Sequence, residues 1–409
     1  MALDQSAVVE LLDALRTGDG VNLIRDAVRW VLQELIEAEA TEVIGAGRYE
    51  RTETRVTERN GHRPRLLATT SGDVELRIPK LRRGSFFPSI LEPRRRIDQA
   101  LHAVVCEAYL DGVSTRSVDD LVAALGVESG ISRSEVSRIC ARLDEIVAAF
   151  RTRRLDHVPF PYVYLDGTYL HVRDARGQVV SKAVIVATGV TATGEREVLG
   201  LDVGDSEDEA FWRAFLRSLR QRGLAGVRLV ISDQHAGLVA ALRRVLQGAA
   251  HQRCRVHFAR NLQALIPKSH QAMVSAAFRM IFAQPDPAAV HEQWDRTPAM
   301  LAERFPKAAS LMDGAKTEVL AFTGFPASHW RKVWSTNPLE RLNKEIKRRC
   351  RVVGIFPNDA SVIRLVGAIL ADTHDEWQAA ERRYLAEGTM AELYPERDTP
   401  DAAELETGD

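Results

Sequence analysis

Two aspartates lie where a chain that builds a sheet would rarely place a charge. Asp166 sits inside YLDGTYLHVRD (164–174), where alternating apolar and polar residues rich in Tyr, Val and Thr predict a half-buried strand. Asp233 ends the apolar run VRLVISD. Two carboxylates brought together repel each other unless a cation neutralises them, and their hard oxygen atoms favour Mg²⁺ or Mn²⁺. The two aspartates therefore indicate metal-dependent chemistry.

A third acid, Glu340, lies in TNPLERLN at the predicted start of a helix. Asn337 is a good N-cap there and Pro338 fits the first helical position, so Glu340 falls at the third, where glutamate is an ordinary capping-box residue. It shares a helical face with Asn343, Lys344 and Lys347. A lone acid among basic residues on an exposed face also suits a metal ligand beside a phosphate-binding strip. The spacing leaves both interpretations open.

Other residues compete for the same role. The acids that follow the third predicted strand favour a solvated loop that caps the next helix; they are Asp202, Asp205, Glu207, Asp208 and Glu209. His235, two residues after Asp233, either hydrogen-bonds near the acids or is an ordinary surface histidine. No Ser-His-Asp arrangement and no glycine-rich phosphate loop is visible.

The charge is unevenly distributed along the 409 residues. The net charge of -1 alone argues against a nucleic-acid ligand. However, residues 48–96 hold 13 Lys and Arg against 6 Asp and Glu, residues 341–351 hold 6 basic residues and one Glu, and the end of the chain is acidic. Each basic block is either a solvated face or a surface for DNA phosphates.

The N-terminal part is predicted to be mainly helical. Residues 1–47 form a helical segment, and residues 48–96 form either a basic arm or a small β unit. Residues 97–155 contain three helical pieces separated by Gly112 and Gly126, which match a helix-turn-helix or a plain three-helix bundle. The outward residues of the last piece, proposed to contact DNA, are Arg133, Ser134, Ser137, Arg138 and Arg142.

The part of the chain that must position the acids is predicted to have an α/β fold. Three strands from Tyr162 onward are followed by alternating helices and strands, which predicts antiparallel strands continued by parallel ones. In such an order the first and fourth strands are commonly neighbours, so Asp166 and Asp233 would project from one edge region of the sheet. Residues 262–335 are predicted to be helical, with Trp294, Trp330 and Trp334 as core anchors.

Several of these motifs, in this order, closely resemble the Mutator-type transposases of bacterial insertion sequences. They are YLDGTYLHVR, VISDQHAGL, CRVHFARNL and STNPLERLNKEIKRR, and the resemblance covers roughly residues 48–370. It implies a ribonuclease-H-like mixed sheet with a helical insertion, an Asp166, Asp233 and Glu340 triad that holds Mg²⁺ or Mn²⁺, and a helix-turn-helix. Cys254 and His257 match the C-x-x-H signature of the family, for which we expect a structural or positioning role. As a zinc site the pair lacks two ligands nearby in sequence.

The resemblance sets the expected organisation. The catalytic domain comprises residues 156–261 and 336–375, the helical insertion residues 262–335, and the acidic tail residues 376–409. Basic residues after Glu340 are expected to bind DNA; they are Lys344, Lys347, Arg348 and Arg349.

The expected function is a DNA transposase that binds terminal inverted repeats, cleaves DNA and joins 3′ ends to a target. The alternatives are a nuclease of the same fold that only hydrolyses, or an inactive DNA-binding protein. Double-stranded DNA and a homodimer or larger assembly are the expected partners. The four scattered cysteines, the absence of a visible secretory signal and the lack of a long apolar run favour a cytoplasmic, nucleoid-associated protein without a membrane partner.

Overall fold

The computed structural model describes residues 20–47, 49–50, 52–91, 133–380 and 382–394. It divides into two compact units, Met1–Arg142 and Leu143–Asp409, which are described separately. None of the helices in these described ranges is long and apolar enough to cross a membrane.

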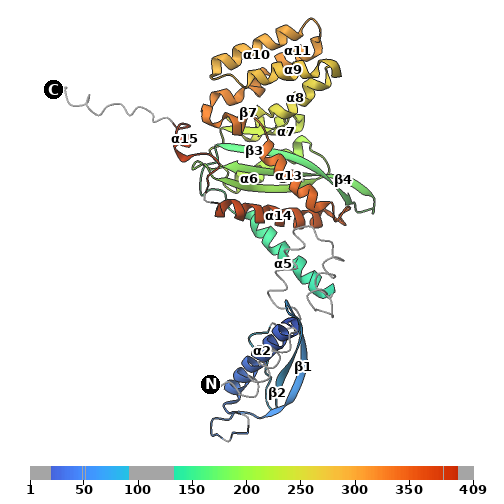
Figure 1. The fold of residues 1–409 in the computed structure, drawn as a ribbon, viewed down its shortest axis with the longest axis vertical. Coiled ribbons are helices and arrows are strands. Elements are labelled where there is room, and N and C mark those ends of the chain that lie inside the picture. The colour runs from blue at the N-terminus through green and yellow to red at the C-terminus, as the bar shows by residue number, and fades with distance from the viewer. Residues whose placement is uncertain (1–19, 48, 51, 92–132, 381, 395–409) are drawn as a thin grey trace, which may run out of the picture. The chain divides into compact units, whose positions relative to one another are not determined.

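The first unit pairs one helix with a hairpin. Helix α2 (Gly20–Ile44) packs against antiparallel strands β1 (Arg59–Thr69) and β2 (Gly72–Leu81), as Figure 1 shows. Buried apolar side chains from all three elements form its core; they include Ile36, Ala40, Leu67, Val74, Leu76 and Ile78. Within the predicted basic segment 48–96, residues 59–81 therefore form a β hairpin.

The predicted helix-turn-helix is only partly within the described residues. Its last helix is α5 (Arg133–Thr152), and the two pieces before it lie outside the described ranges. On α5, Arg138 and Arg142 are exposed. The side chains of Arg133, Ser134 and Ser137 are not among those that the structure describes. The helix-turn-helix therefore stays a prediction.

The second unit is built on a five-stranded mixed sheet of order β5-β4-β3-β6-β7. Its strands are β3 (Tyr162–Arg173), β4 (Val179–Val190), β5 (Arg196–Gly204), β6 (Leu229–Ser232) and β7 (Ala250–Arg253). Strands β3, β4 and β5 pair antiparallel, while β6 pairs parallel with both β3 and β7. The predicted change from antiparallel to parallel pairing is confirmed, and so is the contact between the first and fourth strands.

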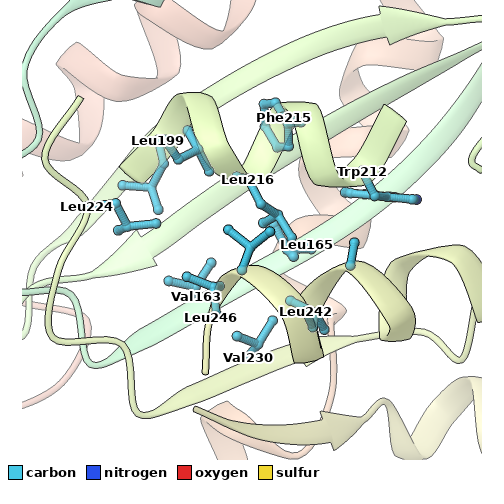
Figure 2. Close-up of a cluster of buried hydrophobic side chains, with 14 of the residues drawn as sticks. Val163, Leu165, Leu199, Trp212, Phe215, Leu216, Leu224, Val230, Leu242 and Leu246 are labelled. Carbon is cyan, nitrogen blue, oxygen red and sulfur yellow. The ribbon is translucent and has the colours of Figure 1, made fainter. Parts of the chain in front are cut away.

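Alternation along β3 decides which face each residue serves. Val163 and Leu165 point into a core beneath α6 (Glu209–Gln221) and α7 (Ala236–Val245), together with the fully buried Trp212 (Figure 2). Tyr164 lies on the other face, where its hydroxyl donates to the carbonyl oxygen of Lys332 over 3.1 Å. Because side chains alternate with a period of two, Asp166 shares the face of Tyr164.

Helices cover that second face. They are α12 (Trp330–Val333), α13 (Asn337–Cys350) and α14 (Asp359–Ala379). α13 contacts β3 and α14 contacts β5. A short helix, α15 (Glu387–Ala391), follows them. Asp208 is the N-cap of α6, accepting a hydrogen bond from the Phe211 amide, so the predicted capping role of that acidic loop is confirmed.

A helical block separates β7 from α13. It contains α8 (Arg255–Ala264), α9 (Lys268–Ile281), α10 (Pro287–Leu301), α11 (Pro306–Val319) and the short 3₁₀ helices η1 (Ala321–Gly324) and η2 (Ala327–His329). In Figure 1, α9, α10 and α11 lie together beyond the β7 side of the sheet. Trp294, Trp330 and Trp334 are all buried, which confirms them as core anchors.

We expect Trp212→Ala to lower the free energy of unfolding by about 3–5 kcal/mol, because it removes a fully buried aromatic ring and leaves a cavity against the sheet. Urea denaturation of the full chain measures the change. Val179→Ala, at an exposed position on β4, is the control and should change stability by less than about 0.5 kcal/mol. A loss below about 1 kcal/mol for Trp212→Ala would contradict this account of the core.

Candidate active site

The register of two parallel strands brings the two aspartates to one level of the sheet. Tyr162 is opposite Leu229 and Tyr164 is opposite Ile231. Two further residues along each strand lead to Asp166 and Asp233. Asp233 directly follows β6, so it lies at the carboxyl end of that strand, where open mixed sheets commonly place functional residues.

Asp166 is largely surrounded by protein. Its Oδ2 accepts a hydrogen bond from Asn343 Nδ2 over 2.8 Å, and its Oδ1 accepts one from the Gly167 amide over 3.0 Å. Burial raises the pKa of Asp166 to about 6, although His257 and these two hydrogen bonds act in the opposite direction. Burial thus disfavours the charged form, and a nearby cation favours it.

Glu340 lies in the first turn of α13, but not where the sequence placed it. The N-cap is Thr336, and the predicted N-cap Asn337 is already helical. The Thr336 hydroxyl donates to Cys254 Sγ and makes no cap hydrogen bond. The capping-box interpretation of Glu340 is therefore wrong: its carboxylate faces His257 Nε2 at 3.4 Å and Arg260 Nη1 at 3.8 Å.

His257 lies between the acids. In addition to the contact with Glu340, its Nδ1 is 3.9 Å from Asp233 Oδ2. The adjacent Cys254 side chain raises the pKa of His257 to about 9, and the Asp233 and Asp166 carboxylates add to the effect. The raised pKa favours the protonated ring, whose charge offsets the mutual repulsion of the carboxylates around it.

Cys254 joins three of the elements that carry these residues. Its sulfur is fully buried and accepts hydrogen bonds from both the amide and the hydroxyl of Thr336, each over 3.4 Å. Its amide donates to the Ser232 carbonyl at the end of β6 over 2.8 Å. Because Cys254 also precedes α8, it holds β6, the first turn of α8 and the start of α13 together.

Three residues near the acids were not among the predicted site residues. Asn343 is buried and its Oδ1 has no hydrogen-bond partner, while Arg260 approaches Glu340. Asn343 is three residues after Glu340 and Arg260 is three after His257, so helical spacing could have indicated both. Glu207 packs over Gly167, where an added Cβ would meet its carboxylate at 2.6 Å; no sequence pattern indicates this contact.

The remaining predicted site residues differ in their exposure and in their ion pairs. His235 is exposed and precedes α7 without a side-chain cap hydrogen bond. Lys344 and Lys347 are exposed on α13. Arg348 and Arg349 both bond to Glu345, and Arg349 is also 4.0 Å from Asp372. The structure therefore leaves Lys344 and Lys347 more accessible to a ligand than Arg349.

The residues fit a divalent cation by their chemistry, although they are not gathered around one point. Among the described residues, no group of three or more His, Cys, Asp or Glu side chains could hold a metal ion. Instead, two of the three carboxylates face the imidazolium of His257.

Comparison with known proteins identifies the family. The model of the family described as "Transposase, Mutator family" matches residues 2–380. The chain belongs to the Mutator family of transposases.

Similar proteins are also transposases of insertion sequences. The transposase for insertion sequence element IS1081 of Mycobacterium tuberculosis is 48% identical, over 89% of this chain and 87% of the relative. The transposase for IS256 in transposon Tn4001 of Staphylococcus aureus is 38% identical, over 87% and 91%. A Drosophila P element transposase strand transfer complex aligns with a TM-score of 0.27 and 10% identity, covering 71% of this chain and 82% of that one; so low a score adds nothing to the argument.

We expect Asn343→Ala to reduce DNA cleavage by this transposase about 10- to 100-fold, because Asp166 loses the amide that orients it. Cleavage of a labelled duplex measures the effect. Melting temperature and DNA affinity should stay close to wild type, which separates loss of positioning from unfolding. Full cleavage activity in a folded Asn343→Ala variant would show that the hydrogen bond is not needed.

Proposed function

We propose that this transposase cleaves DNA and joins 3′ ends to a target with Asp166, Asp233 and Glu340 as its catalytic acids. One observation carries the proposal. His257 contacts Asp233 at the end of β6 and Glu340 on α13, and the parallel register of β3 and β6 brings Asp166 level with Asp233. Acids so far apart in sequence have no structural need to lie near one another, whereas phosphoryl transfer with metal ions needs such a group.

The arrangement of the sheet supports a ribonuclease-H-like fold. Three antiparallel strands are followed by two parallel ones, and the first strand lies at the centre, beside the fourth. Helices α8 to α12 come between β7 and the helix that carries Glu340. We propose residues 156–261 and 336–375 as the catalytic domain and residues 262–335 as the insertion.

The donor set suits Mg²⁺ or Mn²⁺, which would be held by Asp166, Asp233 and Glu340 and would activate the attacking oxygen and stabilise the leaving one. The chain supplies the rest. Asn343 orients Asp166, and His257 holds Asp233 and Glu340 in place by its charge. Lys344 and Lys347, on the exposed side of the same helix, contact DNA phosphates beside the acids. Water attacks in the cleavage step and a DNA 3′-hydroxyl in the joining step.

The N-terminal unit is proposed to recognise the terminal inverted repeats through a helix-turn-helix that ends in α5. The exposed Arg138 and Arg142 support this role, because arginine is the commonest side chain in contacts to DNA phosphates and guanine edges.

We expect Asp166→Asn, Asp233→Asn and Glu340→Gln each to reduce both cleavage and joining by more than about 1,000-fold, since each removes a charged ligand from the site. Duplexes that carry the element's own ends, assayed with Mg²⁺ and with EDTA, measure both steps separately. EDTA should abolish both in the wild type. DNA affinity of the three variants should be unchanged.

Glu303→Gln, at an exposed acid of the helical insertion, is the matched control and should act like the wild type. Full activity of Glu340→Gln would place the third ligand elsewhere. A wild type that cuts end duplexes but never joins them would instead identify a nuclease, and one that does neither with Mg²⁺ or Mn²⁺ would identify an inactive DNA-binding protein.

We also expect two or more chains on a complex that contains two element ends, because both ends must be held together for joining. Light scattering coupled to size-exclusion chromatography measures the mass of this complex. A single chain per two-end complex would refute the expectation.

A further inference from the structure

A second cationic feature of the second unit lies outside the candidate active site. It is a pocket of about 580 Å³ between β5, α12, α13 and α14. We refer to it as the basic pocket; its cationic and aromatic walls include Arg196, Arg331, Lys332, Arg341, Trp377 and Tyr384.

The basic pocket is on the opposite side of α13 from the acids. Glu340 and Asn343 face the site, whereas Arg341, Glu345 and Arg349 line the pocket. Arg349 is nine residues from Glu340, which is about two and a half helical turns and therefore half a turn out of phase. The two features share one helix and do not share side chains.

Aromatic rings hold the cations of the pocket in place. The Arg196 guanidinium lies 4.2 Å from the ring centre of Trp377 and 4.7 Å from that of Tyr384. Lys332 Nζ lies 4.4 Å from the Tyr384 ring centre. Cation–π contacts orient positive groups without neutralising them, so the charge stays available to a ligand.

Two acids, Glu345 and Glu376, also line the pocket, against five cations. Glu345 is bonded to Arg348 and Arg349, and Glu376 makes no ion pair within the described part of the chain. Arg331, Lys332 and Arg341 likewise have no ion pair with any described carboxylate. Burial lowers the pKa of Lys332, and repulsion from Arg196, Arg382 and Arg341 lowers it further. Cations gathered in this way repel one another until an anion joins them.

We propose that the basic pocket binds a phosphate group of a DNA strand. Asn337 and Pro338 at the start of α13 line it, as does Ser335 just before the helix, and the positive end of this 14-residue helix adds to the attraction for an anion. Arginine guanidinium groups match phosphate oxygens in pairs. The proposal rests on the proposed function only in taking DNA as the ligand: α13 would hold DNA on both sides, with catalysis on one and anchoring on the other.

The test measures DNA affinity of the full-length chain as a function of salt. All proteins carry Asp166→Asn and are kept in EDTA, so that no cleavage occurs, and the probe is a fluorescent duplex of arbitrary sequence. The pocket variant combines Arg331→Gln, Lys332→Gln and Arg341→Gln. A control variant removes three exposed cations of the helical insertion; it combines Lys268→Gln, Arg304→Gln and Lys307→Gln.

We expect the pocket variant to bind roughly tenfold or more weakly at about 0.1 M salt, and its slope of log affinity against log salt to fall by about two to three, since each lost phosphate contact removes about 0.9. The control variant should change affinity less than about twofold, and both should keep the melting temperature of the parent. An unchanged slope in a folded pocket variant would overturn the proposal.

The acidic residues after Tyr394 are the competing occupant, and one further protein tests them. In it, these acids are replaced by their amides in the full-length chain. If this change strengthens DNA binding several-fold while the pocket variant keeps the parent's affinity and slope, the acidic residues and not the pocket control DNA affinity, and the proposal is overturned. Because all binding is measured without catalysis, failure of the proposed triad would leave this result unaffected.

Discussion

Backbone hydrogen bonds between β3 and β6 determine which residues reach the end of the sheet together. Their parallel register aligns Tyr164 with Ile231, and the following residues bring Asp166 level with Asp233. A shift of one residue would turn Asp166 into the core beneath α6 and α7, where Leu165 now lies. The alternation of buried side chains along β3 therefore fixes the register of the two strands, and this register positions the two carboxylates.

Like charges must then be held near one another, and the protein does this with a fixed cation. His257 stands between Asp233 and Glu340, and its position depends on Cys254 and Thr336, which tie α8 to α13. A buried polar group costs little when it is hydrogen-bonded, as Cys254 is to Thr336, whereas an unpaired buried carboxylate is costly. This division separates the residues that build the site from those that carry its charge.

Much of the fold follows from local pattern. The segment YVYLDGTYLHVR corresponds to β3 as observed, because alternation and β-branched residues specify a half-buried strand. The burial of the tryptophans in the helical block could also be predicted from the sequence, since large rings rarely remain exposed. The first residue of α13 could not be predicted from the sequence, because Asn337 and Thr336 are both plausible N-caps. The choice depends on Cys254, which is 82 residues from Thr336 in sequence.

The sequence by itself determined the pattern of strands and helices in the second unit, the change from antiparallel to parallel pairing and the three acids worth testing, because periodicity, turn residues and motifs can be read along the chain. Only the tertiary structure decided that Asn343 orients Asp166 across 177 residues, that His257 lies between two acids, and that the far side of α13 faces a basic pocket. The reason is physical: these contacts depend on how separate elements pack, and helical spacing shows which residues share a face but not what that face meets.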